Sequence, residues 1–70
     1  MSLIFGQRLK ELRIEKGLSQ QEVANHFNVS KMTISAWETD KQEPCIDDIV
    51  ELARFFETTT DYLLGLTDEY

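Results

Sequence analysis

Two helix-start signals that follow each other closely constrain the fold of this chain more than any other feature. Ser19 and Glu22 have the spacing of a capping box, in which each side chain satisfies a free backbone N–H of the first helical turn. Ser30 is suited to cap a second helix, and Asn28 before it suits the left-handed residue that ends a helix. The spacing predicts two short helices, over about residues 20–27 and 31–38, that meet at a tight turn.

The stretch before this pair predicts an amphipathic helix. Its apolar side chains recur at helical spacing: Phe5, Leu9 and Leu12. Charged side chains are expected on the opposite, solvated face, which comprises Arg8, Lys10, Glu11, Glu15 and Lys16. Gly17 can adopt the left-handed conformation that follows a last helical turn, so we expect the helix to end at about Lys16.

The second half of the chain predicts two more helices. Residues 39–44 are polar and include the only proline, which indicates a loop before a helix that begins at residue 45 or 46. The apolar stripe of that helix comprises Ile46, Ile49, Leu52, Ala53 and Phe56. A last short helix over about residues 60–64 ends at Gly65. Because no stretch shows the alternation of a strand, the sequence predicts an all-α fold.

Length and composition fit a single small domain over residues 1–70. Of the 70 residues 41% are hydrophobic and 29% are charged, which argues against disorder, and no apolar run approaches the roughly 20 residues of a membrane span. We expect a soluble, cytoplasmic protein, because the chain begins without a signal peptide and its single cysteine cannot form an intrachain disulfide. A core this small contributes only about 3–5 kcal/mol, so dimerisation is a realistic further source of stability.

The helix expected over residues 31–38 has an outer face suited to a DNA groove. If Ile34 points inward, a helical wheel places Trp37 and Glu38 on the inner side as well. The outer side and its edges carry Lys31, Met32, Thr33, Ser35, Ala36 and Thr39. Small, polar and basic side chains allow close approach to base edges and phosphates, and two short helices at a tight turn present one helix to the major groove. The pattern therefore predicts binding to double-stranded DNA.

These residues resemble the phage repressor/Cro type of helix-turn-helix, also called the XRE family. The similarity runs through residues 18–24 and 29–38 and extends to 8–13, 52–53 and 61–65, so it covers nearly the whole chain. The resemblance implies a compact five-helix bundle of the lambda-repressor-like type, with the helix-turn-helix at about residues 19–38. It also implies a bacterial or phage-encoded transcriptional regulator. We expect a repressor that binds a near-palindromic operator as a homodimer, and an activator role is equally compatible with the sequence.

The resemblance also implies roles for individual positions. Gln20 is expected at the phosphate backbone or at a nearby base edge. The main base-reading positions are Lys31, Met32 and Ala36. Phosphate or supporting contacts are expected from Ser30, Thr33, Ser35, Thr39 and Lys41. Arg13 and Glu38 match an ion pair that ties the first helix to the end of the recognition helix.

Three positions depart from the usual pattern. Asn28 and Glu57 stand where the family usually has glycine. A glutamate held in a left-handed turn should cost about 1–2 kcal/mol, so we expect either this strain or a locally different turn at Glu57. Ala36 has no hydrogen-bonding group, so it can only pack against a thymine methyl or leave the base unread. We expect modest affinity per monomer, completed by a two-fold dimer that reads two half-sites about one helical turn apart.

The net charge of −6 is unusual for a DNA-binding domain, which normally presents a basic surface. Six basic and five acidic side chains give residues 1–42 a charge of +1, whereas one basic and eight acidic side chains give residues 43–70 a charge of −7. We expect the acidic segment to face away from the phosphates. The charge also supports a second hypothesis, a protein-interaction module such as an antitoxin or adaptor that keeps the fold with little DNA affinity.

The remaining candidate residues for a functional site lie outside the helix expected over residues 31–38. Of two adjacent phenylalanines, Phe56 is expected inside and Phe55 outside. There Phe55 could either pack peripherally or form a dimer surface with Val50, Tyr62 and Leu66. His26, Cys45 and the carboxylates of Asp47, Asp48 and Glu51 lack the partners or spacing of a catalytic or metal site. We therefore expect neither an enzyme nor a cofactor, metal, membrane or small-molecule ligand.

Overall fold

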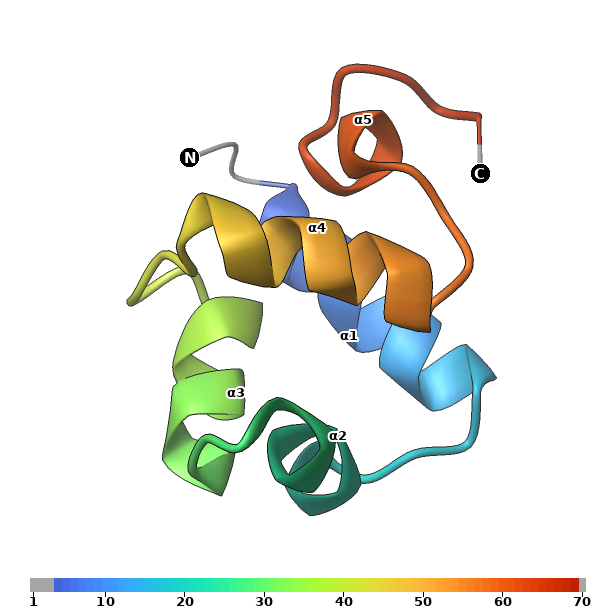
Figure 1. The fold of residues 1–70 in the computed structure, drawn as a ribbon. Coiled ribbons are helices and arrows are strands. Elements are labelled where there is room, and N and C mark those ends of the chain that lie inside the picture. Colours follow the sequence, from blue (N-terminus) through green and yellow to red (C-terminus); the bar gives the residue numbers. More distant parts are fainter. Residues whose placement is uncertain (1–3, 70) are drawn as a thin grey trace.

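Five α-helices follow one another in the computed structural model, which describes residues 4–69 (Figure 1). They are α1 (Phe5–Glu15), α2 (Gln20–Phe27), α3 (Lys31–Glu38), α4 (Ile46–Phe55) and α5 (Thr60–Leu63). No strand occurs within residues 4–69, so the predicted all-α fold class is confirmed. None of the helices in this range is long and apolar enough to cross a membrane.

The starts of α2 and α3 have the predicted side-chain caps. The Ser19 hydroxyl accepts a hydrogen bond from the Glu22 N–H at 3.0 Å, and the Glu22 carboxylate accepts one from the Ser19 N–H at 2.9 Å. The Ser30 hydroxyl caps α3 by accepting from the Thr33 N–H at 3.1 Å. Asn28 follows α2 in the left-handed conformation, with φ at 60°. These local contacts produce the tight turn at which α2 and α3 pack together.

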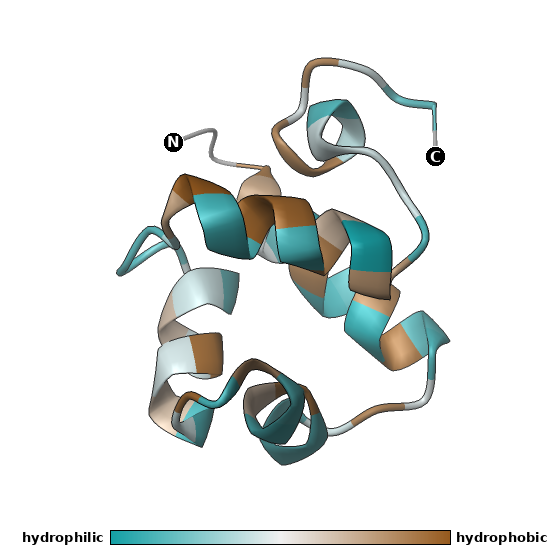
Figure 2. Cartoon of the chain, viewed as in Figure 1, coloured by the Kyte–Doolittle hydropathy of each residue, from teal (hydrophilic) through white to brown (hydrophobic). Residues whose placement is uncertain are grey.

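The core lies between α1 and the helices that surround it. α1 packs against α3 and α5, and α4 packs against α5. The buried apolar side chains are Phe5, Leu9, Leu12, Val23, Ala24, Ile34, Trp37, Ile49, Leu52, Ala53, Phe56 and Leu63. In Figure 2 the α3–α4 loop is hydrophilic, whereas apolar and polar segments alternate along α4. Every helix therefore contributes to one shared core, as the apolar spacing predicts.

α1 approaches α3 so closely that only glycine fits at position 6. A Cβ at Gly6 would lie 2.4 Å from the carbonyl oxygen of Glu38 and 2.8 Å from that of Trp37. The Gly6 N–H donates to the Asp40 carboxylate at 3.3 Å. Ile4, at the N-cap of α1, makes no side-chain cap, so Asp40 supplies an acceptor from 34 residues away. The N-terminal end of α1 is thus held against the C-terminal end of α3.

The expectation that Arg8 lies on a solvated face is wrong. Its side chain is buried, and its guanidinium donates to the carbonyl oxygens of Tyr62 and Thr67 and to the Asp68 carboxylate. The guanidinium carbon also lies 4.1 Å from the centroid of the Tyr62 ring. Arg8 can be buried because acceptors from the segment around α5 satisfy its donors.

Two apolar side chains also differ from the sequence predictions. Ile46, expected in the buried stripe of α4, is 78% exposed because it is the first residue of the helix and lies outside the buried cluster. Phe56 is buried as expected, but Phe55 is half-buried rather than exposed. The ring of Phe55 is covered by α2, with centroid distances of 4.3 Å to His26 and 5.7 Å to Phe27.

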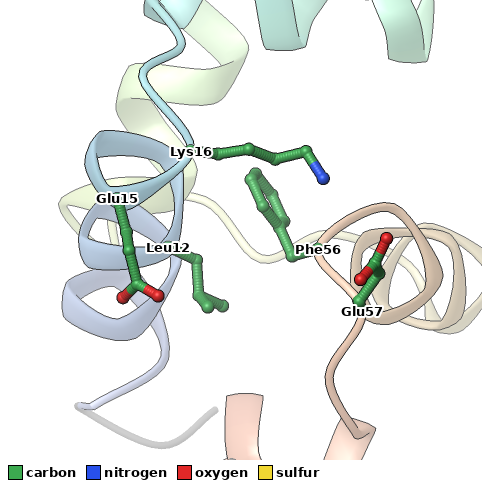
Figure 3. Close-up of a pocket in the computed structure, with 5 residues that line it drawn as sticks. All are labelled: Leu12, Glu15, Lys16, Phe56 and Glu57. Carbon is green, nitrogen blue, oxygen red and sulfur yellow. The ribbon is translucent and has the colours of Figure 1, made fainter.

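A hollow of about 230 Å³ separates the C-terminal end of α1 from the turn between α4 and α5 (Figure 3). Lys16 reaches across it, and its Nζ donates to the Phe55 carbonyl oxygen at 3.2 Å, where the negative end of the α4 dipole favours a cation. Glu57 lines the other side of the hollow and has a φ of 55°. The left-handed turn is therefore kept although its residue is a glutamate.

Replacing Glu57 with glycine is expected to raise the free energy of unfolding by about 0.5–1 kcal/mol. Glycine relieves the strain of a positive φ, and the greater freedom of glycine in the unfolded chain offsets part of that gain. Urea unfolding followed by far-UV circular dichroism measures the change. The control is Glu51→Gly, an exposed site inside α4, where glycine should instead destabilise by about 1 kcal/mol. An equal decrease in the free energy of unfolding of Glu57→Gly and Glu51→Gly would contradict the prediction.

Candidate nucleic-acid interface

The outer face of α3 gathers most of the side chains expected to contact DNA. An open groove of about 300 Å³ crosses this face, and its lining residues are Met32, Ser35, Ala36, Thr39 and Lys41. Met32 is 80% exposed and Lys31 beside it is exposed as well. Ser35 and Ala36 are half-buried along the floor of this face. The structure thus brings five of the predicted residues together in one concave surface.

The opposite face of α3 is fixed in the core. Ile34 is fully buried and Trp37 is 2% exposed. The Trp37 ring also packs edge-on against Phe27 of α2, at a centroid distance of 6.4 Å. The helical wheel therefore assigned the buried and the exposed face of α3 correctly. Because the buried face is fixed, α3 cannot rotate without disrupting the core.

Glu38 anchors the C-terminal end of α3 to both neighbouring helices. Its side chain is 2% exposed, and its Oε2 accepts from Arg13 Nε of α1 at 2.6 Å. Its Oε1 accepts from Arg13 Nη2 at 3.2 Å and from Gln20 Nε2 of α2 at 3.0 Å. Arg13 also donates to the Leu18 carbonyl oxygen at 2.9 Å, in the link between α1 and α2. One carboxylate therefore sets the position of α3 relative to α1 and α2.

Gln20 belongs to this network rather than projecting freely from α2. Its side chain is half-buried and its amide nitrogen donates to Glu38. The resemblance implies a contact of Gln20 with the phosphate backbone or with a base edge, and that role stays a prediction. The helix wheel missed its partner because Glu38 lies 18 residues away in the sequence.

Three hydroxyl groups around α3, those of Ser30, Thr33 and Thr39, are hydrogen-bonded within the protein. Ser30 Oγ caps the helix and lies 3.1 Å from Thr33 Oγ1. Thr39 Oγ1 donates to the Ser35 carbonyl oxygen at 2.9 Å. Lys31 and Lys41 differ, since neither side chain makes an ion pair or hydrogen bond with another part of residues 4–69. Lys41 lines the groove and Lys31 directly precedes the lining residue Met32, so both lysines are free cationic groups close to this face.

Part of the acidic segment lies away from the side of the molecule that α2 and α3 form. Figure 1 shows α5 and the C-terminal segment at the opposite end of the molecule from α2. Asp61 in α5 and the following Asp68 and Glu69 belong to that end. The separation of charge along the sequence is thus partly a separation in space, which lowers the electrostatic repulsion between the groove and a polyanion.

The four residues of the predicted dimer surface do not share one environment. Phe55 packs near Lys16 at the C-terminal end of α1, whereas Tyr62 packs on Arg8 nearer its other end. Val50 is half-buried and Leu66 is 73% exposed. The structure therefore does not bring Phe55 and Tyr62 together, and the dimer surface stays a prediction.

The sequence of the chain is similar to a family of known proteins. A helix-turn-helix family model matches residues 9–63. The uncharacterized HTH-type transcriptional regulator YobD of Bacillus subtilis (strain 168) is 33% identical over 66 residues, which cover 94% of this chain and 59% of the relative. The HTH-type transcriptional regulator ImmR of the same organism is 38% identical over 61 residues, which cover 87% of this chain and 48% of the relative. The cryptic phage CTXphi transcriptional repressor RstR of Vibrio cholerae is 38% identical over 53 residues, which cover 76% of this chain and 48% of the relative. The chain spans about half the length of these relatives.

Proposed function

This chain belongs to the XRE-type helix-turn-helix family, and from that premise we propose that it is a transcriptional regulator that binds double-stranded DNA. The observation that carries the proposal is the two-sided construction of α3. Its inner face is fixed by Ile34, Trp37 and Glu38, while its outer face presents an open groove that Lys41 lines, with Lys31 at the start of the helix. A rigid helix with a small, basic-edged outer face suits the major groove.

In the proposed mechanism α3 lies in the major groove, Lys41 contacts a phosphate, and the Lys31 ammonium lies between a base edge, the role that the resemblance implies, and the adjacent phosphate. A homodimer places two such helices on the half-sites of a near-palindromic operator, because the outer face of a single α3 is small. Where the operator overlaps a promoter, occupancy alone blocks the polymerase, and no catalytic step is required. Repression is the proposed outcome, and activation from a differently placed operator would use the same contacts.

Replacing Lys31 with alanine is expected to weaken binding to a selected operator duplex about five- to tenfold and to lower the salt slope by about 1. The reason is the loss of one free cation at the start of α3, next to the groove residue Met32. Fluorescence anisotropy of short duplexes, selected from a genomic pool and titrated at two salt concentrations, measures both quantities. Arg54→Ala is the matched control, because it removes an equal charge from α4, where Arg54 is paired with Glu51.

The result would decide between two classes of function. Saturable binding that weakens with salt and with Lys31→Ala, but not with Arg54→Ala, supports the regulator. Absence of saturable binding even at about 50 mM salt would contradict it. The charge of −7 on residues 43–70 would then favour a protein-interaction module that keeps the fold with little DNA affinity.

A further inference from the structure

The hollow between α1 and the turn that follows α4 carries opposite charges on its two sides. It is separate from the groove on α3, since the two share no lining residue. Glu15 and Lys16 lie on the α1 side, and Glu57 lies on the other side. Leu12 and Phe56 supply the apolar part of the lining, and Figure 3 shows their side chains pointing into the space between the two segments. A ligand in this hollow therefore meets an ammonium, carboxylates and apolar surface together.

The charged groups of Lys16 and Glu57 remain available to a ligand. The Lys16 ammonium donates one hydrogen bond, to the Phe55 carbonyl oxygen, so two of its three N–H donors are left. The Glu57 carboxylate makes no hydrogen bond or ion pair within residues 4–69. Although the two groups have opposite charges and line one hollow, no ion pair joins them in this part of the chain. A ligand that carries both a carboxylate and an ammonium satisfies both groups.

Glu57 occupies its position at a cost in stability. Its φ of 55° lies in the left-handed region, where glycine avoids the penalty of a side chain. Its carboxylate gains no compensating contact within residues 4–69. Strained residues are concentrated at functional sites, where a side chain is needed for something other than stability. The strain therefore supports a binding role for the Glu57 carboxylate.

The size of the hollow limits its ligand to a small molecule. Pockets for drug-sized ligands measure about 300–1,000 Å³, whereas this hollow measures about 230 Å³. Because an engineered cavity of about 150 Å³ holds a molecule of benzene, the hollow has room for about nine non-hydrogen atoms. Free leucine has this size, and it carries a carboxylate, an ammonium and a branched apolar side chain. Size, charge and apolar lining thus point to the same class of ligand.

We propose that this hollow binds a free α-amino acid with an apolar side chain. The ammonium of the amino acid pairs with Glu57, and Glu15 adds negative charge from the opposite side. The carboxylate of the amino acid accepts from Lys16, while its side chain covers the accessible edges of Leu12 and Phe56. Sequence analysis predicted no small-molecule ligand, because no local motif joins Lys16 to Glu57, which lies far away in the chain.

NMR titration of the isotope-labelled protein with L-leucine tests the proposal. We expect saturable shifts of the backbone amides that surround the hollow. The expected dissociation constant is about 1 mM, because solvent screens the charges of an open site. Isocaproate lacks the ammonium of leucine and isoamylamine lacks its carboxylate. Each analogue is expected to bind about fivefold more weakly than leucine, the upper end of the effect of an exposed ion pair.

Glu57→Gly is the most informative variant, because it is expected to be more stable than the wild type, so that a loss of binding cannot reflect unfolding. We expect it to weaken leucine binding about fivefold. Glu57→Gln keeps the side chain but removes its charge, and Lys16→Met keeps the alkyl chain but removes the ammonium, so both should weaken binding to a similar degree. Glu51→Gln is the matched control, because it removes a carboxylate from α4 outside the hollow and should leave the dissociation constant unchanged.

Several results would overturn the proposal. One is the absence of saturable shifts up to about 20 mM leucine, roughly 20 times the expected dissociation constant. Another is an affinity for leucine that stays unchanged in Glu57→Gly and Lys16→Met. Equal affinity for leucine, isocaproate and isoamylamine would show that the charged ends are not recognised, and would overturn the assignment to an amino acid. None of these results bears on DNA binding, because the hollow includes no residue of α3.

Discussion

Replacing Gly6 with alanine is expected to lower the free energy of unfolding by about 3 kcal/mol, at the upper end of the cost of overpacking. The added Cβ would lie 2.4 Å and 2.8 Å from the backbone oxygens of Glu38 and Trp37. Backbone atoms cannot rotate away as a side chain does, so α1 must move from α3 and lose the Asp40 hydrogen bond. Helix propensity alone predicts the opposite sign, because alanine favours a helix over glycine by about 1 kcal/mol.

Urea unfolding followed by far-UV circular dichroism tests this sign. Gly17→Ala is the matched control, because its Cβ would have no atom within 4 Å while its φ of 74° still disfavours alanine. We expect Gly17→Ala to lower the free energy of unfolding by about 1 kcal/mol, from backbone strain alone. Unchanged or increased stability of Gly6→Ala would show that α1 and α3 are less tightly joined than their backbone distances indicate.

Replacing Glu38 with alanine in the wild-type chain is also expected to lower the free energy of unfolding by about 3 kcal/mol. The substitution leaves Arg13, with a side chain only 12% exposed, without its counter-ion and removes the partner of the Gln20 amide. Breaking a buried ion pair on one side strands an uncompensated charge, which costs about 3–5 kcal/mol. Because Arg13 keeps its hydrogen bond to the Leu18 carbonyl oxygen, the lower end of that range applies here.

A double-mutant cycle identifies the cause of the loss. Glu38→Leu combined with Arg13→Met is expected to recover most of the stability, because no buried charge is then left alone. Glu51→Ala is the control, since it breaks an exposed pair with side chains 54% and 75% exposed and should cost less than about 0.5 kcal/mol. If Glu38→Ala also lowered the free energy of unfolding by less than about 0.5 kcal/mol, the buried Arg13–Glu38 pair would contribute little to stability.

Helix starts were predictable because their signals are local. Ser19 and Glu22 act across three residues, and Ser30 reaches Thr33 across the same distance. Once α3 was placed, its wheel also separated the buried Trp37 from the exposed Met32. The outer face of the candidate site therefore follows from sequence, since side-chain direction on a helix is fixed by its period.

The remaining features depend on contacts that local patterns do not contain. Arg8 was placed in solvent because its acceptors at Tyr62 and Thr67 lie 54 and 59 residues away. Gly6 carried no signal, because its role comes from the approach of another helix. The apolar stripe of α4 could not show that Ile46 lies beyond the edge of the core. Spacing tells which residues share a face, and only the packing of helices tells what covers that face.

The junction between Gly6 and Asp40 defines a boundary for protein engineering. Asp40 follows α3 and accepts from the first turn of α1, so the recognition segment and the start of the chain form one unit. A chimera that imports α3 from a relative would therefore need to carry the transplanted segment through residue 40 and keep glycine at position 6. Shorter grafts would transfer the side chains that are proposed to contact bases but would lose the connection that sets their angle to the rest of the protein.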